Sequence, residues 1–268
     1  DNSNVIISGN TVTLPAEFKD NTELDGIKIY AAVNGQTAFY PLMIKKWTLT
    51  LQDDFDGDKL NNEIWSNSSG SANCISVNGG KLTMKITTDE NGKEYDPYIT
   101  TRNKFAQQYG CFTARMLMPK TTETSVSAFW LLPSNYNNNW GTSYLFEGTN
   151  LSCGEVDIIE YPSNWNGEAQ SALQWWNPTN ISGSHSATSQ KYKYDKLKNG
   201  EYIDATGIWT ADALYFYYDG ILQGSITNIS ATGEKACMIL SMSTWSGEFN
   251  PKAVDSLYCT VDYVKAYK

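Results

Sequence analysis

The sequence of 268 residues has 20 Lys and Arg, 29 Asp and Glu, and a formal net charge of −9 at pH 7. A nucleic-acid-binding surface needs a Lys or Arg for each phosphate contact, so this charge argues against nucleic acid and anionic membranes as partners. No run of 18 apolar residues is present, and we predict no membrane span. The low charged fraction of 18% suits a secreted, extracellular protein. The chain starts at Asp1 without a signal peptide, which we interpret as a mature or trimmed form, or one attached to the cell surface through a missing segment.

The first 45 residues contain short runs in which apolar and polar side chains alternate. These runs are Val5–Thr13, Gly26–Val33 and Gln36–Lys45. The turn pair Asn34-Gly35 separates the last two runs, which predicts a β-hairpin. We interpret residues 1–45 as a small β appendage or the remnant of a preceding module, and residues 46–268 as the main domain.

The main domain contains many short strand candidates separated by turn signals, and no helical pattern longer than a turn or two. The candidates are Lys81–Thr87, Cys111–Met118, Ser127–Leu132, Val156–Tyr161, Ala172–Trp176, Ala213–Tyr218, Ala236–Met242 and Thr260–Tyr267. Evenly spaced short strands are typical of sandwiches and barrels. We therefore predict an all-β fold, and a domain of this length can bury a sizeable core between two stacked sheets.

Three carboxylates lie within six residues of one apolar, β-branched strand candidate. They are Glu155, Asp157 and Glu160. Side chains of a regular strand alternate between its faces, so Glu155 and Asp157 share one face and Glu160 lies on the other. A β-bulge at Ile158 or Ile159 adds one residue and brings Glu160 back to the shared face. We therefore predict a bulge and three carboxylates in one cleft.

Clustered carboxylates favour glycoside hydrolysis with retention of configuration. That reaction needs an ionised nucleophile close to a protonated acid, and like charges raise one another's pKa values. We expect Asp157 to orient Glu155 and to raise the pKa of Glu160. The competing interpretation is a metal site or a solvated edge, but calcium sites usually lie in loops.

Six further segments, together with the carboxylate strand, resemble the segments of one known family and occur in the same order along the chain. They are Asp53–Gly57 with Trp65 downstream, Gly79–Leu82, Tyr109–Arg115, Ala128–Leu132, Tyr215–Gly220 and Val261–Tyr267. Together these segments resemble glycoside hydrolase family 16 from about residue 47 to residue 268. The resemblance implies a β-jelly-roll sandwich, concanavalin A-like, with a concave substrate cleft. It also implies Glu155 as nucleophile, Asp157 as helper and Glu160 as general acid/base of an endo-acting enzyme.

Other segments differ from the laminarinases of that family. Val126-Ser127 replace a Trp-Pro pair, and Gln174 stands in a strand where a His is common. The late strand Ser241–Gly247 replaces a glycine-rich one. The predicted substrate is a β-1,3- or β-1,3-1,4-glucan, and the alternative is a β-galactan or a galactose-containing host glycan. A non-catalytic glycan-binding module is the rival class, and the complete carboxylate set argues against it.

The 9 Trp and 17 Tyr exceed the needs of a core, and flat aromatic rings stack on the apolar faces of sugars. We assign Trp65 and Trp209 to the core. Gln174 and Arg102 are polar candidates for substrate contacts. The aromatic candidates for the cleft are Trp130, Trp140, Trp165, Trp176 and Trp245.

The remaining reactive residues carry weaker signals. Five cysteines without a Cys-x-x-Cys pair, and one His, argue against a structural zinc site, and buried free thiols are expected. His185 falls in the polar segment Ser182–Ser189, which we predict to be a loop. No cofactor is expected for catalysis, whereas the family resemblance implies a structural calcium ion at Asp262 and Gly80. The expected partner is a polysaccharide or oligosaccharide, and the expected state a monomer.

Overall fold

The computed structural model describes the backbone in ten segments: 6–8, 11–13, 28–33, 36–41, 47–119, 125–135, 145–147, 152–176, 185–244 and 257–268. The chain divides into two compact units, Asp1–Thr48 and Leu49–Lys268. The first unit contains two antiparallel pairs. Their strands are β1 (Ile6–Ser8) with β2 (Thr11–Thr13), and β3 (Lys28–Val33) with β4 (Gln36–Pro41). Val33 pairs with Gln36, which confirms the predicted hairpin.

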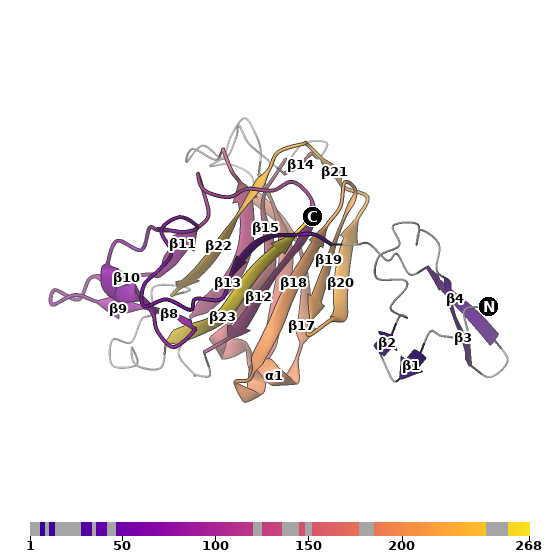
Figure 1. Cartoon of the computed structure of the whole chain (residues 1–268), viewed down its shortest axis with the longest axis horizontal. Helices are drawn as coiled ribbons and strands as arrows, with labels where there is room; N and C mark the ends of the chain where they lie inside the picture. Colours follow the sequence, from indigo (N-terminus) through magenta and orange to yellow (C-terminus); the bar gives the residue numbers. More distant parts are fainter. Residues whose placement is uncertain are drawn as a thin grey trace. The chain divides into compact units, whose positions relative to one another are not determined.

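The second unit contains two large antiparallel sheets that lie face to face (Figure 1). The first sheet has the order β17 (His185–Lys193), β16 (Glu168–Trp176), β15 (Ser152–Pro162), β13 (Val126–Pro133), β22 (Ala236–Ser243), β11 (Tyr98–Thr100) and β6 (Ser66–Asn67). The short strands β14 (Phe146–Glu147) and β21 (Ser230–Ala231) join it beside β15. We call this the catalytic sheet, for the predicted role of its strand β15.

The second sheet has the order β20 (Ile221–Thr227), β19 (Ala213–Tyr218), β18 (Tyr202–Trp209), β12 (Gly110–Leu117), β23 (Tyr258–Tyr267), β8 (Leu82–Lys85) and β7 (Ile75–Val77), and β5 (Leu49–Asp53) pairs with β23. A separate pair is β9 (Thr87–Thr88) with β10 (Glu94–Tyr95). The helical turns are η2 (Ala72–Cys74), η3 (Ser163–Trp165) and α1 (Asp195–Asn199). In the described part of the chain, no helix is long and apolar enough to cross a membrane.

The main core lies between the two sheets because each contributes one apolar face. In β18, every second residue from Ile203 to Trp209 is buried, and the residues between them are half-buried. Phe129 and Leu131 of β13 enter the same core, as do Trp65 and Trp209, which are 0% and 2% exposed. This packing confirms the predicted all-β sandwich, and the two tryptophans confirm their predicted place in the core.

The structure corrects the prediction of a loop at Ser182–Ser189. His185 begins β17, which pairs along its whole length with β16. The described side chains of its first half, from Ala187 to Ser189, are exposed, so the strand has no apolar alternation that sequence reasoning could detect. The strands β18 and β20 were also missed, the first because Gly207 stands in its buried row and Ile208 in its outward row, which blurs the apolar alternation.

The four described cysteines, at positions 74, 111, 237 and 259, are free thiols, and three of them are buried. Burial is the main cause that raises the pKa of the Cys111 thiol to about 11. These cysteines agree with the prediction of free, mostly buried thiols. The side chain of Cys153 lies outside the described residues.

Candidate active site

A β-bulge in β15 brings the three carboxylates to one face of the catalytic sheet. Against β13, Phe129 pairs with Ile159 but Trp130 pairs with Asp157, so Ile158 is the additional residue. Against β16, Asp157 pairs with Ala172 and Glu160 with Gln170. The predicted bulge is therefore present, and it lies at one of the two residues named for it.

The bulge keeps its two isoleucines in the core while the carboxylates point the other way. Ile158 and Ile159 are 1% and 0% exposed and belong to the main core. Ile158 packs against β18 at Gly207, where an added Cβ would lie 2.8 Å from the Cγ1 atom of Ile158. The Ser171 hydroxyl donates to the Ile158 carbonyl over 2.7 Å and holds the bulged backbone.

The register assigns the neighbours of each carboxylate, because residues directly opposite in an antiparallel pair share a face. Glu155 lies opposite Gln174, Asp157 opposite Trp130, and Glu160 opposite Gln170. The rows continue across β13 to β22 and β11: Trp130 is followed by Ile239 and Thr100. The catalytic strand thus lies in the middle of a continuous polar and aromatic face.

Asp157 is the most deeply buried of the three, at 1% exposure. Its Oδ2 atom accepts a hydrogen bond of 2.9 Å from the Gln174 side chain, and its carboxyl group shares a second hydrogen bond with Glu155. Burial, followed by the charges of Glu155 and Glu160, raises the pKa of Asp157 well above the ordinary value. A protonated Asp157 donates to Glu155, which is the orientation expected of the helper.

Burial is also the main cause that raises the pKa of Glu155, to about 8; the hydrogen bond with Asp157 opposes this shift and the charge of Glu160 adds to it. The pKa of Glu160 is raised by burial, and the Gln170 amide, which donates to its Oε2 atom over 2.7 Å, acts in the opposite direction. The raised pKa of Glu160 agrees with expectation. Burial is its main cause; because the charges of Glu160 and Asp157 act on each other, the expected influence of Asp157 on that pKa stays a prediction.

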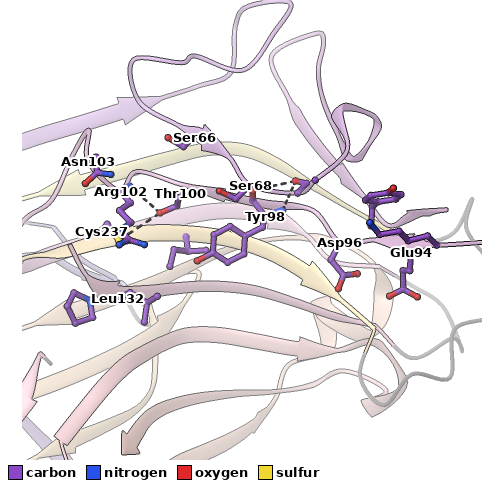
Figure 2. A pocket seen from close by; sticks show the side chains of 16 residues that line it. Ser66, Ser68, Glu94, Asp96, Tyr98, Thr100, Arg102, Asn103, Leu132 and Cys237 are labelled. Atoms are coloured by element: carbon purple, nitrogen blue, oxygen red, sulfur yellow. Dashed lines mark hydrogen bonds between the residues drawn. The ribbon is translucent and has the colours of Figure 1, made fainter. Parts of the chain in front are cut away.

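A cavity of about 840 Å³ opens on the same face, over β6, β11, β22 and the end of β13 (Figure 2). Its floor is a second, smaller apolar cluster of Leu132, Cys237 and Ile239, with Tyr98 and Trp130 packed against it. The Tyr98 and Trp130 rings meet edge to face at 5.9 Å, and the Trp130 indole donates to the Ser241 hydroxyl over 3.0 Å. We call this cavity the distal pocket.

The predicted substrate residues divide into three groups. Trp130, Gln174 and Arg102 lie at the site: the first two flank Asp157, and Arg102 lines the distal pocket. Trp165 lies in η3 with the Lys191 ammonium 3.8 Å from its ring centroid, so Lys191 already covers one ring face. Trp176 ends β16, but its side chain, like the whole of Trp140 and Trp245, lies outside the described residues.

Asp262 lies on β23, and Gly80 lies in the turn that precedes the neighbouring strand β8, since Val261 pairs with Leu82. The Asp262 carboxylate lies 3.5 Å from the Arg115 guanidinium. Among the described residues, no group of three or more His, Cys, Asp or Glu side chains could hold a metal ion. The side chains here do not assemble a carboxylate site for calcium, and that site stays a prediction.

Sequence reasoning missed four residues of this face: Gln170, Ser241, and the pair Glu94 and Asp96 at the distal pocket. Gln170 had a detectable signal, because it lies in a strand that follows the carboxylates and shares the parity of Gln174. Glu94 and Asp96 had none, since they belong to a polar stretch that carries no periodic pattern.

Comparison with known families matches residues 61–265 to the model for glycosyl hydrolases family 16. Two curated relatives come from Rhizobium meliloti (strain 1021). They are endo-1,3-1,4-beta-glycanase ExsH, 25% identical over 213 residues, and endo-1,3-1,4-beta-glycanase EglC, 27% identical over 207 residues. Each alignment covers 74% of this chain, but the chain spans only 40% of the length of either relative.

Solved structures with the same fold include three enzymes. An endo-beta-1,3-glucanase from Pyrococcus furiosus has a TM-score of 0.66 and 20% identity over 89% of this chain and 97% of its own. A laminarinase from Flavobacterium sp. UMI-01 has a TM-score of 0.67 and 22% identity over 82% and 100%. A GlcNAcα1-4Gal-releasing endo-β-galactosidase from Clostridium perfringens has a TM-score of 0.66 and 22% identity over 85% and 64%.

Proposed function

Because this chain belongs to glycosyl hydrolase family 16, we propose that it is a retaining endo-β-glycosidase that cleaves a β-1,3- or β-1,3-1,4-glucan. One observation carries this proposal: the bulge of β15 places Glu155, Asp157 and Glu160 on one face, beside a cavity whose apolar floor packs against Tyr98 and Trp130. Burial raises their pKa values, and no cation among the described residues acts in the opposite direction. Such an arrangement costs stability, and it suits a reaction that needs a protonated acid near neutral pH.

In the first step, protonated Glu160 donates its proton to the glycosidic oxygen while a carboxylate oxygen of Glu155 attacks the anomeric carbon. The bond between that carbon and the glycosidic oxygen breaks, and a covalent glycosyl–Glu155 ester forms. Asp157 hydrogen-bonds to Glu155 and holds its carboxylate in place. Gln174 fixes Asp157 in turn.

In the second step, ionised Glu160 removes a proton from water, and the resulting hydroxide attacks the anomeric carbon. Glu155 leaves as a carboxylate and the sugar keeps its β configuration. Gln170 donates to Glu160, so it favours the ionised form that this step requires. The two glutamines therefore position the two catalytic carboxyl groups from the same neighbouring strand.

The glucan assignment draws on the two curated relatives, which are named as endo-1,3-1,4-beta-glycanases. The alternative substrate is a β-galactan, and it draws on Gln174, which stands where laminarinases often have a His. A polysaccharide does not cross a cell membrane unaided, so we propose that the protein acts outside the cell. A panel of β-glucans and β-galactans, scored for released oligosaccharides, separates the two substrate classes.

The test of the reaction is the Glu155→Gln variant, with Glu90→Gln as the matched control because Glu90 is exposed in the turn between β9 and β10. We expect kcat to fall by at least about 1,000-fold in Glu155→Gln, since the covalent route is lost, and to stay unchanged in the control. Azide should partly restore turnover of an activated substrate by Glu155→Ala. Proton NMR of the first wild-type product should show the β anomer.

Near-normal turnover by Glu155→Gln would remove the nucleophile assignment, and an initial α product would rule out double displacement. A wild-type protein that binds glycans but cleaves none would instead support the glycan-binding module.

A further inference from the structure

The distal pocket lies on the same face as the catalytic carboxylates, at a distance greater than one sugar unit. From Asp157, the row of paired residues runs through Trp130 and Ile239 to Thr100. Three strand spacings separate its ends, roughly 14 Å. A glycan that crosses the strands from the cleavage point therefore reaches this pocket with a unit that takes no part in the chemistry.

A pair of carboxyl groups, Glu94 and Asp96, forms one end of the pocket (Figure 2). The two share a hydrogen bond, and the Thr244 hydroxyl donates to Glu94 over 2.6 Å. The Oδ1 atom of Asp96 is buried and accepts no hydrogen bond from any described residue. A buried acceptor without a donor costs free energy, so it marks a place where a ligand hydroxyl would be stabilised.

Among the described residues, neither carboxyl group of the pair forms an ion pair, although the Lys93 ammonium lines the same pocket. Burial, and then the charge of Glu94, raise the pKa of Asp96 to about 6. Three further titratable groups lie near the pair: the buried Cys74 thiol, whose pKa the Asp96 charge helps to raise, and Lys93 and Tyr95, which line the pocket. The Lys93 ammonium lies over the Tyr95 ring at 4.8 Å from its centroid.

The other walls suit a sugar ring. The Tyr98 ring lies between the carboxyl pair and the rest of the pocket, and it meets Trp130 edge to face. Arg102 and Asn103 line the opposite end, where the Thr100 hydroxyl accepts from the Arg102 backbone N–H over 3.1 Å. Aromatic walls with polar groups at both ends are the usual composition of a carbohydrate site.

We propose that the distal pocket binds a neutral sugar unit of the substrate, and that Asp96, supported by Glu94, determines this specificity by accepting hydrogen bonds from its hydroxyls. This inference rests on the proposed function and names the substrate class for one part of its cleft. Carboxylated or sulfated units are disfavoured at this end of the pocket, because their charge would meet the Glu94 and Asp96 carboxyl groups.

The experiment compares the wild type with Asp96→Ala, Asp96→Asn and the control Glu90→Gln. Substrates are neutral oligosaccharides of one linkage series and increasing length, at pH 5 and pH 7. We expect Asp96→Ala to raise KM about tenfold for oligosaccharides long enough to reach the pocket, with kcat unchanged. The shortest cleaved oligosaccharide should show no change, and neither should any substrate with the control.

The ratio of the KM values for long and short substrates reports on the distal pocket alone, because titration of the catalytic carboxyl groups changes the KM values of both substrates. In the wild type this ratio should change between pH 5 and pH 7, as Asp96 ionises, and in Asp96→Asn it should not. Asp96→Asn has nearly the same shape as the wild-type side chain, so it replaces Asp96→Ala in the length comparison if that variant folds poorly. A carboxylated or sulfated analogue of equal length should have the higher KM.

An equal loss on short and long substrates in Asp96→Ala would overturn this inference and leave the proposed function intact. A preference of the wild type for the anionic analogue would also overturn it. Full activity in Glu155→Gln would instead remove the proposed function, and this inference with it.

Discussion

Each of the two sheets carries a carboxylate cluster of three or more described residues or ion-paired groups, and these two clusters differ in how their charge is balanced. On the catalytic sheet, Glu155, Asp157 and Glu160 have raised pKa values because burial is not offset by a cation. On the second sheet, Asp204 lies 3.2 Å from the Arg115 guanidinium and Asp219 lies 2.8 Å from the Lys196 ammonium. The second cluster is an ordinary ion-pair network.

Asp219 shows the contrast most directly. Partial burial acts to raise its pKa, but the Lys196 ammonium, the Asp204 backbone N–H and the Tyr194 hydroxyl together outweigh burial and lower it. Both clusters are carboxylate-rich, so composition does not separate them. What separates them is compensation: a carboxyl group left without a cation indicates function, and one paired with a cation indicates structure.

The largest expected effect concerns the uncompensated cluster. The pKa of Glu155 is raised from 4.5 to about 8, so its ionisation is more costly in the folded state than in the unfolded one. Below pH 4.5 Glu155 is protonated in both states, and the free energy of unfolding is not reduced. As the pH rises to about 8, the unfolded state releases this proton more readily, and the free energy of unfolding falls. At pH 8, Glu155→Gln should therefore be more stable than the wild type by roughly 3 kcal/mol or more.

Thermal unfolding of both proteins at pH 4.5 and pH 8 measures this difference. At pH 4.5 the two Tm values should nearly coincide. A variant that is less stable than the wild type at pH 8 would contradict the idea that this cluster is a source of instability.

A smaller effect is expected from the bulge that holds the cluster. In Gly207→Ala, the new Cβ would lie 2.8 Å from Ile158, which must then move. Overpacking of this kind costs about 1–3 kcal/mol, and a shifted Ile158 displaces the carboxylates on either side of it. Denaturant unfolding and kcat on the best glycan measure both effects.

Gly224→Ala serves as the control, because it also meets close side-chain neighbours but in β20, away from the bulge. It should lower stability without lowering kcat in the folded protein. If Gly207→Ala leaves kcat unchanged, Ile158 does not position the catalytic groups.

The smallest effect is expected in the compensated cluster. Asp219→Asn removes the ion pair with Lys196, which is partly exposed, so we expect a loss below about 1 kcal/mol and no change in kcat. Because the pKa of Asp219 is lowered, this stability is present above pH 3.8 and is lost as the pH falls below it. Unfolding measured at pH 7 and pH 3 should show a larger difference between wild type and variant at pH 7 than at pH 3.

Much of this arrangement could be predicted from the sequence where a local pattern determines it. The spacing of Glu155, Asp157 and Glu160 conflicts with strict alternation, and a bulge is the smallest change that resolves the conflict. The pair Glu94 and Asp96 could not be predicted, because it faces the cleft only after β11 pairs with β22, about 140 residues later in the chain. Strand β17 was missed because its solvent-facing side chains lack an apolar alternation.

The position of β15 in its sheet has a consequence for what happens after the bond is cut. Two strands, β16 and β17, lie on one side of it, while β13, β22, β11 and β6 lie on the other. In the proposed reaction, a polymer laid across the strands would contact more strands on the side of the distal pocket than on the other. The fragment that contacts fewer strands would then dissociate first, and the other fragment would compete with incoming substrate as a product inhibitor.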